Sequence, residues 1–140
     1  MDVTSRDVYP VQSFYPSART AAANGDAYVD LQGYEGAIIH IASGVITDGT
    51  VWTFELKESA TTSGFTAVAD ADLVAGGPTA GDLEPIFTAV TEDNDDHWFG
   101  YKGSKRYLRI DLTAVTGSPG TGGIFVGTVF KVKPRHAPTV

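Results

Sequence analysis

Residues 101–112 read YKGSKRYLRIDL, and apolar side chains alternate with polar ones through the second half of this stretch. Leu108, Ile110 and Leu112 fall on one face of an extended chain. A period of two residues is typical of a strand that buries one face and leaves the other open. We therefore predict a strand whose apolar face joins a core. The side chains predicted to face water or a partner are Lys105, Arg109 and Asp111.

Similar strand patterns recur along the chain. The clearest is VWTFELKE at 51–58, and its predicted inward-facing residues are Trp52, Phe54 and Leu56. The run AIIHIA at 37–42 is nearly continuous in apolar residues, which is typical of a central strand. Between these two segments, Asp48-Gly49 is a strong signal for a hairpin turn. Further strands are predicted at 26–32, 65–69, 85–90 and 124–133.

The composition favours strands over helices. The 140 residues include 16 glycines and 7 prolines, and β-branched and aromatic residues are common. Short strands at regular spacing predict an all-β chain that folds as a single-domain β-sandwich, with immunoglobulin-like and jelly-roll topologies both open. The predicted divisions are an extended N-terminal arm at 1–25, the sandwich at 26–133 and a C-terminal tail at 134–140.

The N-terminal segment has an unusual pattern. It contains two Tyr-Pro steps, which favour extended backbone, and three aromatic residues at Tyr9, Phe14 and Tyr15. A solvated tail rarely carries so many aromatic side chains. Two interpretations are open: an arm that lies along its own domain or a neighbour, or an ordinary first strand. In the first, the three aromatic residues and Arg19 would contact the partner.

The sequence carries no signature of an enzyme or a cofactor site. It has no cysteine, which excludes disulfides and thiolate metal sites. It also lacks phosphate-loop, dinucleotide-binding and nucleophile-elbow motifs. No apolar run is long enough to span a membrane, and the first residues lack the apolar segment of a signal peptide. We therefore predict a protein that is not an enzyme, has no cofactor and has no membrane contact.

An acidic cluster is the one candidate for a metal site. Glu92, Asp93, Asp95 and Asp96 supply the carboxylate oxygens that Ca²⁺ prefers, but their spacing does not match an EF-hand loop. A solvated, charged loop is the favoured interpretation, with cation binding left open. The three histidines are far apart in sequence and form no metal or catalytic motif.

Charge is distributed unevenly along the chain. Residues 1–101 carry three basic and sixteen acidic side chains, whereas residues 102–140 carry seven basic side chains against Asp111 alone. This asymmetry predicts attraction to an acidic protein surface, including that of a second copy. The basic residues predicted to contact such a partner are Lys105, Arg109, Lys131, Lys133 and Arg135. Because the net charge is −7, we predict no nucleic-acid partner.

Four segments resemble small, cysteine-free, all-β structural proteins of tailed bacteriophage virions. They are ITDGTVWTFEL at 46–56, ESATTSGFTAVADADL at 58–73, YKGSKRYLRI at 101–110 and GTVFKVKPRHAP at 127–138. The resemblance implies a virion structural protein, in particular a head decoration (cement) protein. Its implied partners are the major capsid protein and neighbouring copies of itself, with a homotrimer as the implied oligomer. The implied location is the capsid surface, after synthesis in the host cytoplasm.

Two alternatives to the decoration role stay open. One is a component of the phage tail or neck, such as a tube, adaptor or fibre-base protein. The other is a carbohydrate-binding module in which Trp98 and Tyr107, or Trp52, form an aromatic platform for a sugar.

Overall fold

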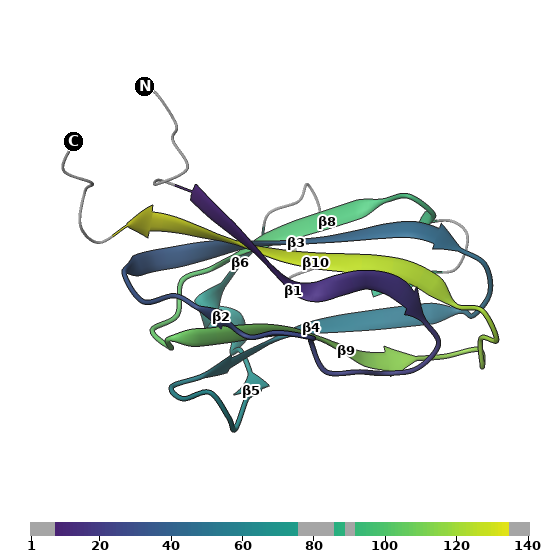
Figure 1. Cartoon of the computed structure of the whole chain (residues 1–140), viewed down its shortest axis with the longest axis horizontal. Helices are drawn as coiled ribbons and strands as arrows, with labels where there is room; N and C mark the ends of the chain where they lie inside the picture. Colours follow the sequence, from purple (N-terminus) through teal and green to yellow (C-terminus); the bar gives the residue numbers. More distant parts are fainter. Residues whose placement is uncertain (1–7, 76–85, 89–91, 135–140) are drawn as a thin grey trace.

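The computed structural model describes residues 8–75, 86–88 and 92–134, and it shows two antiparallel sheets packed face to face (Figure 1). A 3-10 turn spans Asp70–Asp72. The described strands are β1 (Val8–Arg19), β2 (Val29–Asp30), β3 (Tyr34–Ile46), β4 (Val51–Ser59), β5 (Thr66–Ala67), β6 (Leu73–Ala75), β7 (Ile86–Thr88), β8 (Asp96–Tyr101), β9 (Tyr107–Val115) and β10 (Gly123–Pro134). The predicted all-β sandwich is therefore confirmed.

The strand order identifies the topology. The first sheet, here called sheet A, has the order β1-β10-β3-β8-β6, and the second, sheet B, has the order β2-β9-β4-β5 with β7 also paired to β4. Pairing is nested: β1 with β10, β2 with β9, β3 with β8 and β4 with β7. This is the pattern of one long hairpin wrapped into two layers, which is a jelly roll. Of the two topologies left open by the sequence, the structure adopts this one.

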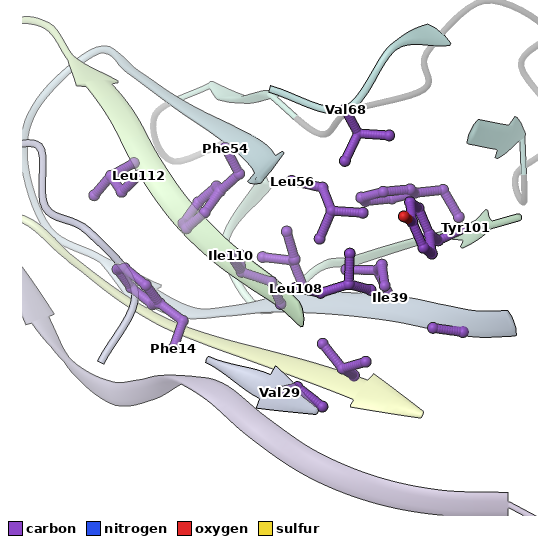
Figure 2. Close-up of a cluster of buried hydrophobic side chains, with 14 of the residues drawn as sticks. Phe14, Val29, Ile39, Phe54, Leu56, Val68, Tyr101, Leu108, Ile110 and Leu112 are labelled. Carbon is purple, nitrogen blue, oxygen red and sulfur yellow. The ribbon is translucent and has the colours of Figure 1, made fainter. Parts of the chain in front are cut away.

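The core lies between the two sheets and is rich in aromatic rings. Leu108, Ile110 and Leu112 are 1% exposed or less, which confirms the predicted inward face of β9. Phe54 on β4 lies at the centre, and its ring makes edge contacts with Phe14. The other rings in edge contact with Phe54 are Phe87 and Phe125. Figure 2 shows Phe14 and Phe54 among the buried side chains that lie between the strands.

The N-terminal segment is part of the sandwich, so the interpretation of residues 1–25 as a separate arm is wrong for the described residues. Strand β1 pairs with β10 along its length and forms one edge of sheet A. Bulges on both sides of Phe14 turn its side chain fully into the core. Pro10 and Pro16 lie on this strand, and proline is tolerated there because an edge strand leaves part of its backbone unpaired.

Buried Ser13 connects β1 to the opposite sheet. Its Oγ donates a hydrogen bond to the carbonyl oxygen of Ala27 at 2.6 Å and accepts one from the backbone N–H of Ile110 at 3.0 Å. Three segments that are distant in sequence therefore meet at one hydroxyl group. Residues 1–7 of the predicted arm and residues 135–140 of the predicted C-terminal tail lie outside the described part of the chain.

Asp111 is a second correction to the sequence prediction. Its side chain was predicted to face water or a partner, but it is 3% exposed. The connection between β1 and β2 passes over it, and the backbone N–H of Gly25 donates a 2.7 Å hydrogen bond to its carboxylate. Arg109 makes a bidentate pair with the same carboxylate, with N–O distances of 2.7 and 2.8 Å. The outer polar face of β9 is thus partly covered by the protein's own chain.

Asp48-Gly49 does not form the predicted hairpin. Strands β3 and β4, which flank it, belong to different sheets, so this turn carries the chain from one layer to the other. The Asp48 carboxylate instead accepts hydrogen bonds from the backbone N–H groups of residues 120–122. These donors hold the pKa of Asp48 below its ordinary value, because they stabilise the charged form.

Candidate functional site

The outer face of sheet A carries an apolar row that crosses all five strands. The register aligns Pro10 on β1 with Phe130 on β10, and Phe130 with Ile38 on β3. It continues from Ile38 to Gly100 on β8 and from Gly100 to Val74 on β6. Ile38 and Val74 are 38% and 46% exposed. A continuous apolar row on the solvent side of a sheet is characteristic of a surface that meets another molecule.

A shallow groove of about 370 Å³ lies along this row. Gly36 and Gly100 contribute to it from neighbouring strands, and their lack of side chains leaves room between the flanking residues. Trp98 lines the groove and is 51% exposed, which is unusual for so large an apolar ring. Three charged residues also line it: Lys102, Lys133 and Glu35. The groove therefore combines an aromatic anchor with charged groups.

The outer face of sheet B has the opposite character. On β4, Glu55 and Lys57 form an ion pair at 2.9 Å, and on β9 Arg109 pairs with Asp111. These side chains neutralise one another within the chain. The outer face of sheet B is thus rich in paired charges, whereas the outer face of sheet A carries the apolar row.

Part of the predicted basic surface is assembled at one end of the sandwich. Lys133 is the second-last residue of β10 and Lys102 follows β8, and both line the groove. Lys105 lies in the turn that leads into β9, beside the start of β3. The ammonium group of Lys131 lies 4.6 Å from the ring centre of Tyr9 and 5.0 Å from that of Tyr34. Arg135 lies outside the described residues.

The other predicted contact residues have varied positions. Tyr9 and Tyr15 are 49% and 48% exposed and remain accessible. Phe14 is a core residue, so its predicted role as an anchor for a partner is wrong. Arg19 pairs with Asp26 at 2.7 Å and stacks over the Phe14 ring. Arg19 and Arg109 therefore make their charged contacts within the protein, and these contacts stabilise the fold.

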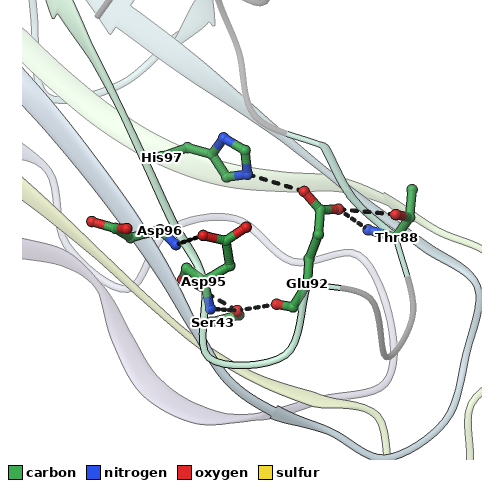
Figure 3. A network of polar contacts seen from close by, with 6 residues as sticks. All are labelled: Ser43, Thr88, Glu92, Asp95, Asp96 and His97. Atoms are coloured by element: carbon green, nitrogen blue, oxygen red, sulfur yellow. Dashed lines mark hydrogen bonds and ion pairs between the residues drawn. The ribbon is translucent and has the colours of Figure 1, made fainter. Parts of the chain in front are cut away.

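The acidic loop lies at the other end of sheet A and forms an ordered polar network (Figure 3). Glu92 contacts His97 at 3.2 Å, and its backbone carbonyl accepts a hydrogen bond from Ser43. Asp96 pairs with His40 at 2.8 Å across β8 and β3. These contacts attach the loop to the sheet, so it is more structured than the solvated loop predicted from sequence.

Part of this network has the composition of a metal site. Glu92, Asp95 and His97 each offer a ligand atom, and these atoms lie within 4.8 Å of one another. Carboxylate oxygens and an imidazole nitrogen suit several divalent cations. The hydrogen bonds of Glu92 and Asp95 within the protein already account for their positions, so we assign no ion to the cluster.

The predicted sugar platform does not form. Trp98 lies on sheet A and Tyr107 on sheet B, and their side chains point away from opposite faces of the sandwich. Trp52 is fully buried in the core. A flat pair of exposed aromatic rings therefore cannot be built from these three residues.

Sequence reasoning missed the apolar row as a surface. The run at 37–42 predicts a central strand, and β3 is central in sheet A, but its Ile38 side chain is exposed while that of Ile39 is buried. The available signal was the apolar character of the second face, repeated at Phe130 and Val132 in the last strand. What the sequence did not show was that no second layer of the described chain covers that face.

Comparison with known proteins supports the fold assignment. No protein-family model matches the chain, and no curated protein matches it by sequence. The fold is similar to that of the SPBc2 prophage-derived protein YomS, known from a crystal structure, with a TM-score of 0.53. The two chains share 10% sequence identity, and the match covers 89% of this chain and 92% of that one. Within the described residues, no helix has the length and apolar character to cross a membrane.

Proposed function

We propose that the protein is a non-enzymatic structural protein of a bacteriophage particle, and that it binds the outer capsid surface and stabilises the head. The observation that carries the phage assignment is the likeness in fold to a prophage-derived protein over nearly the full length of both chains. Jelly rolls occur in viral capsid proteins but also in lectins, so the fold by itself does not give the function.

The exposed residues support a role in binding other proteins. Tyr9 and the neighbouring Lys131 form an accessible aromatic and cationic pair at one end of the sandwich. Lys105 lies in the turn at the same end, and no ion pair within the described residues involves it or Lys131. Aromatic and cationic groups are frequent at the energetic centres of interfaces. We assign this end to the capsid protein and the outer face of sheet A to neighbouring copies.

A decoration protein stabilises the assembled shell because it binds that state and not the separated subunits. The direct test is to mix the purified protein with capsids of the encoding phage that lack it. We expect the protein to sediment with expanded capsids and to raise the temperature at which they rupture. Lys131→Glu should reduce binding at least tenfold, whereas Lys57→Glu, on the polar face of sheet B, should leave binding unchanged.

The alternative position in the particle is the tail or neck. Rings or tubes formed by the pure protein, together with no binding to capsids, would favour that position. Failure to bind any part of the particle would remove the proposed function altogether.

A further inference from the structure

Three aromatic side chains, here called the aromatic cluster, meet on the outer side of sheet B. The ring centre of Tyr28 lies 6.3 Å from that of Phe65, with 29° between the ring planes, and 5.4 Å from that of Tyr107 in an edge contact. Tyr107 faces outward because the next residue, Leu108, faces the core. Tyr28 is 48% exposed, and the other two rings are partly exposed. The cluster is therefore separate from the core, and neither tryptophan is part of it.

Two arginine side chains pack against these rings. The guanidinium of Arg109 lies 4.6 Å from the ring centre of Phe65, and that of Arg106 lies 5.0 Å from the ring centre of Tyr107. A cation over an aromatic ring is attracted by the negative charge of the ring face. The rings are thus held by partners within the protein, so a ligand would not have to order them when it binds.

The charges of these two arginines are balanced within the chain. Arg106 makes a bidentate pair with Asp30, with both N–O distances at 2.9 Å, and Arg109 pairs with Asp111 as described above. Each guanidinium therefore has a carboxylate within hydrogen-bond distance. Neither a polyanion nor a cation would gain much from charge at this surface, which favours an uncharged ligand.

Polar groups and a pocket adjoin the aromatic cluster on the Arg106 side. Arg106 donates a 2.7 Å hydrogen bond to the amide oxygen of Gln32, whose amide nitrogen has no hydrogen-bond partner among the described residues. Both side chains also line a pocket of about 220 Å³. Its other lining residues include Ser104, Lys105 and Glu35. Hydrogen-bond donors and acceptors thus lie next to an aromatic surface.

We infer that the aromatic cluster and the adjoining pocket bind an uncharged oligosaccharide. A pyranose ring has an apolar face of C–H groups, which stacks on aromatic rings, and a rim of hydroxyl groups, which donate and accept hydrogen bonds. The first matches Tyr28, the most exposed of the three rings, and the second matches Gln32 and the pocket. A nucleic-acid strand requires unpaired cations for its phosphates, whereas these arginines are paired. A protein partner would bury both ion pairs, at a cost in desolvation.

The first experiment applies the purified protein to a glycan array. The array carries neutral glucans, mannans, galactans and N-acetylglucosamine oligomers, with heparin and polysialic acid as acidic probes. We expect binding to one or more neutral glycans. Isothermal titration calorimetry with the best-bound neutral glycan of the array then compares variants. Tyr28→Ala should weaken binding roughly tenfold, because one aromatic anchor carries much of the binding energy of a small site. The matched control, Tyr15→Ala, removes a ring of the same exposure, 48%, from β1 in sheet A and should leave binding unchanged.

Two further variants separate binding from folding. Tyr28→Trp keeps an aromatic ring at this position and should bind as tightly as the wild type. Gln32→Ala changes an exposed side chain, so it should leave the unfolding midpoint unchanged but weaken binding roughly threefold, the effect of one lost hydrogen bond. No bound glycan, binding to the acidic probes alone, or equal affinities of Tyr28→Ala and Tyr15→Ala would overturn the inference. If Tyr28→Ala failed to fold, unchanged affinity of Gln32→Ala would overturn it.

This sugar site goes beyond the proposed function, and its test does not need a virion. Lys105 lines the pocket and also belongs to the end assigned to the capsid protein, so the array uses the free protein. A protein that binds capsids but no glycan would remove this inference alone. A protein that binds a neutral glycan but has no place in a phage particle would remove the proposed function alone.

Discussion

Replacing Phe14 with alanine tests whether β1 is a structural part of the sandwich. The ring is fully buried, lies 5.4 Å from the ring of Phe54 in an edge contact and is covered by the Arg19 guanidinium at 4.1 Å. Truncating a buried phenylalanine costs about 3–5 kcal/mol, which includes the cavity left behind. Since domains of this kind have a total stability of about 5–15 kcal/mol, Phe14→Ala should remain folded but much less stable.

The neighbouring residue supplies the control. Tyr15 is 48% exposed, so Tyr15→Ala should change the free energy of unfolding by no more than about 0.5 kcal/mol. Urea unfolding followed by tryptophan fluorescence measures both variants, and in heating experiments Phe14→Ala should lower the melting temperature by roughly 10–15 °C. If Phe14→Ala were as stable as Tyr15→Ala, residues 8–19 would be a detachable arm and the packing described here would be incorrect.

Two further predictions concern polar groups that hold the fold together. Ser13→Ala should lower the free energy of unfolding by about 2–4 kcal/mol in urea titrations, because it leaves the buried backbone groups of Ile110 and Ala27 without their partner; Ser17→Ala, on the exposed part of β1, is the control and should have little effect. Asp48→Asn should be less stable than the wild type at neutral pH, and this difference should narrow as the pH falls below about 4. The sign follows from the lowered pKa of Asp48 in the folded state: its stabilisation is present above the pKa of the unfolded chain and is lost as the carboxylate becomes protonated. If the difference in stability between Asp48→Asn and the wild type stayed constant from pH 7 to acidic pH, the charge of Asp48 would not contribute to the stability of the fold.

The alternation of side chains predicted the core strands well because burial on one face is a local property of the sequence. Leu108, Ile110 and Leu112 point inward as their spacing predicted, and so do Phe54 and Leu56. The composition likewise predicted a sandwich. The nested pairing of the jelly roll could not be predicted from the sequence. It depends on contacts between strands that are about a hundred residues apart, such as β1 and β10.

The errors arose where a distant segment changed the environment of a residue. Asp111 lies on the polar side of its strand, but Gly25 belongs to a connection 86 residues earlier in the chain that covers it. Phe14 lies among Tyr-Pro steps that suggest a free arm, and only the bulges in its pairing with β10 turn it inward. Conversely, Ile38 belongs to a nearly continuous apolar run, which is typical of a buried strand. No other described strand covers its side of sheet A, so its side chain is exposed. Local patterns give the faces of a strand, whereas tertiary contacts decide what each face meets.

The central claim is that this protein stabilises a phage head from outside, and electron microscopy of particles that lack it tests that claim most directly. The coding sequence would be deleted from the phage or prophage, and particles would be compared with the wild type before and after heating. We predict intact but fragile heads with density missing from the outer capsid surface. Heads of normal strength with absent or malformed tails, or fully normal infectious particles, would contradict the account.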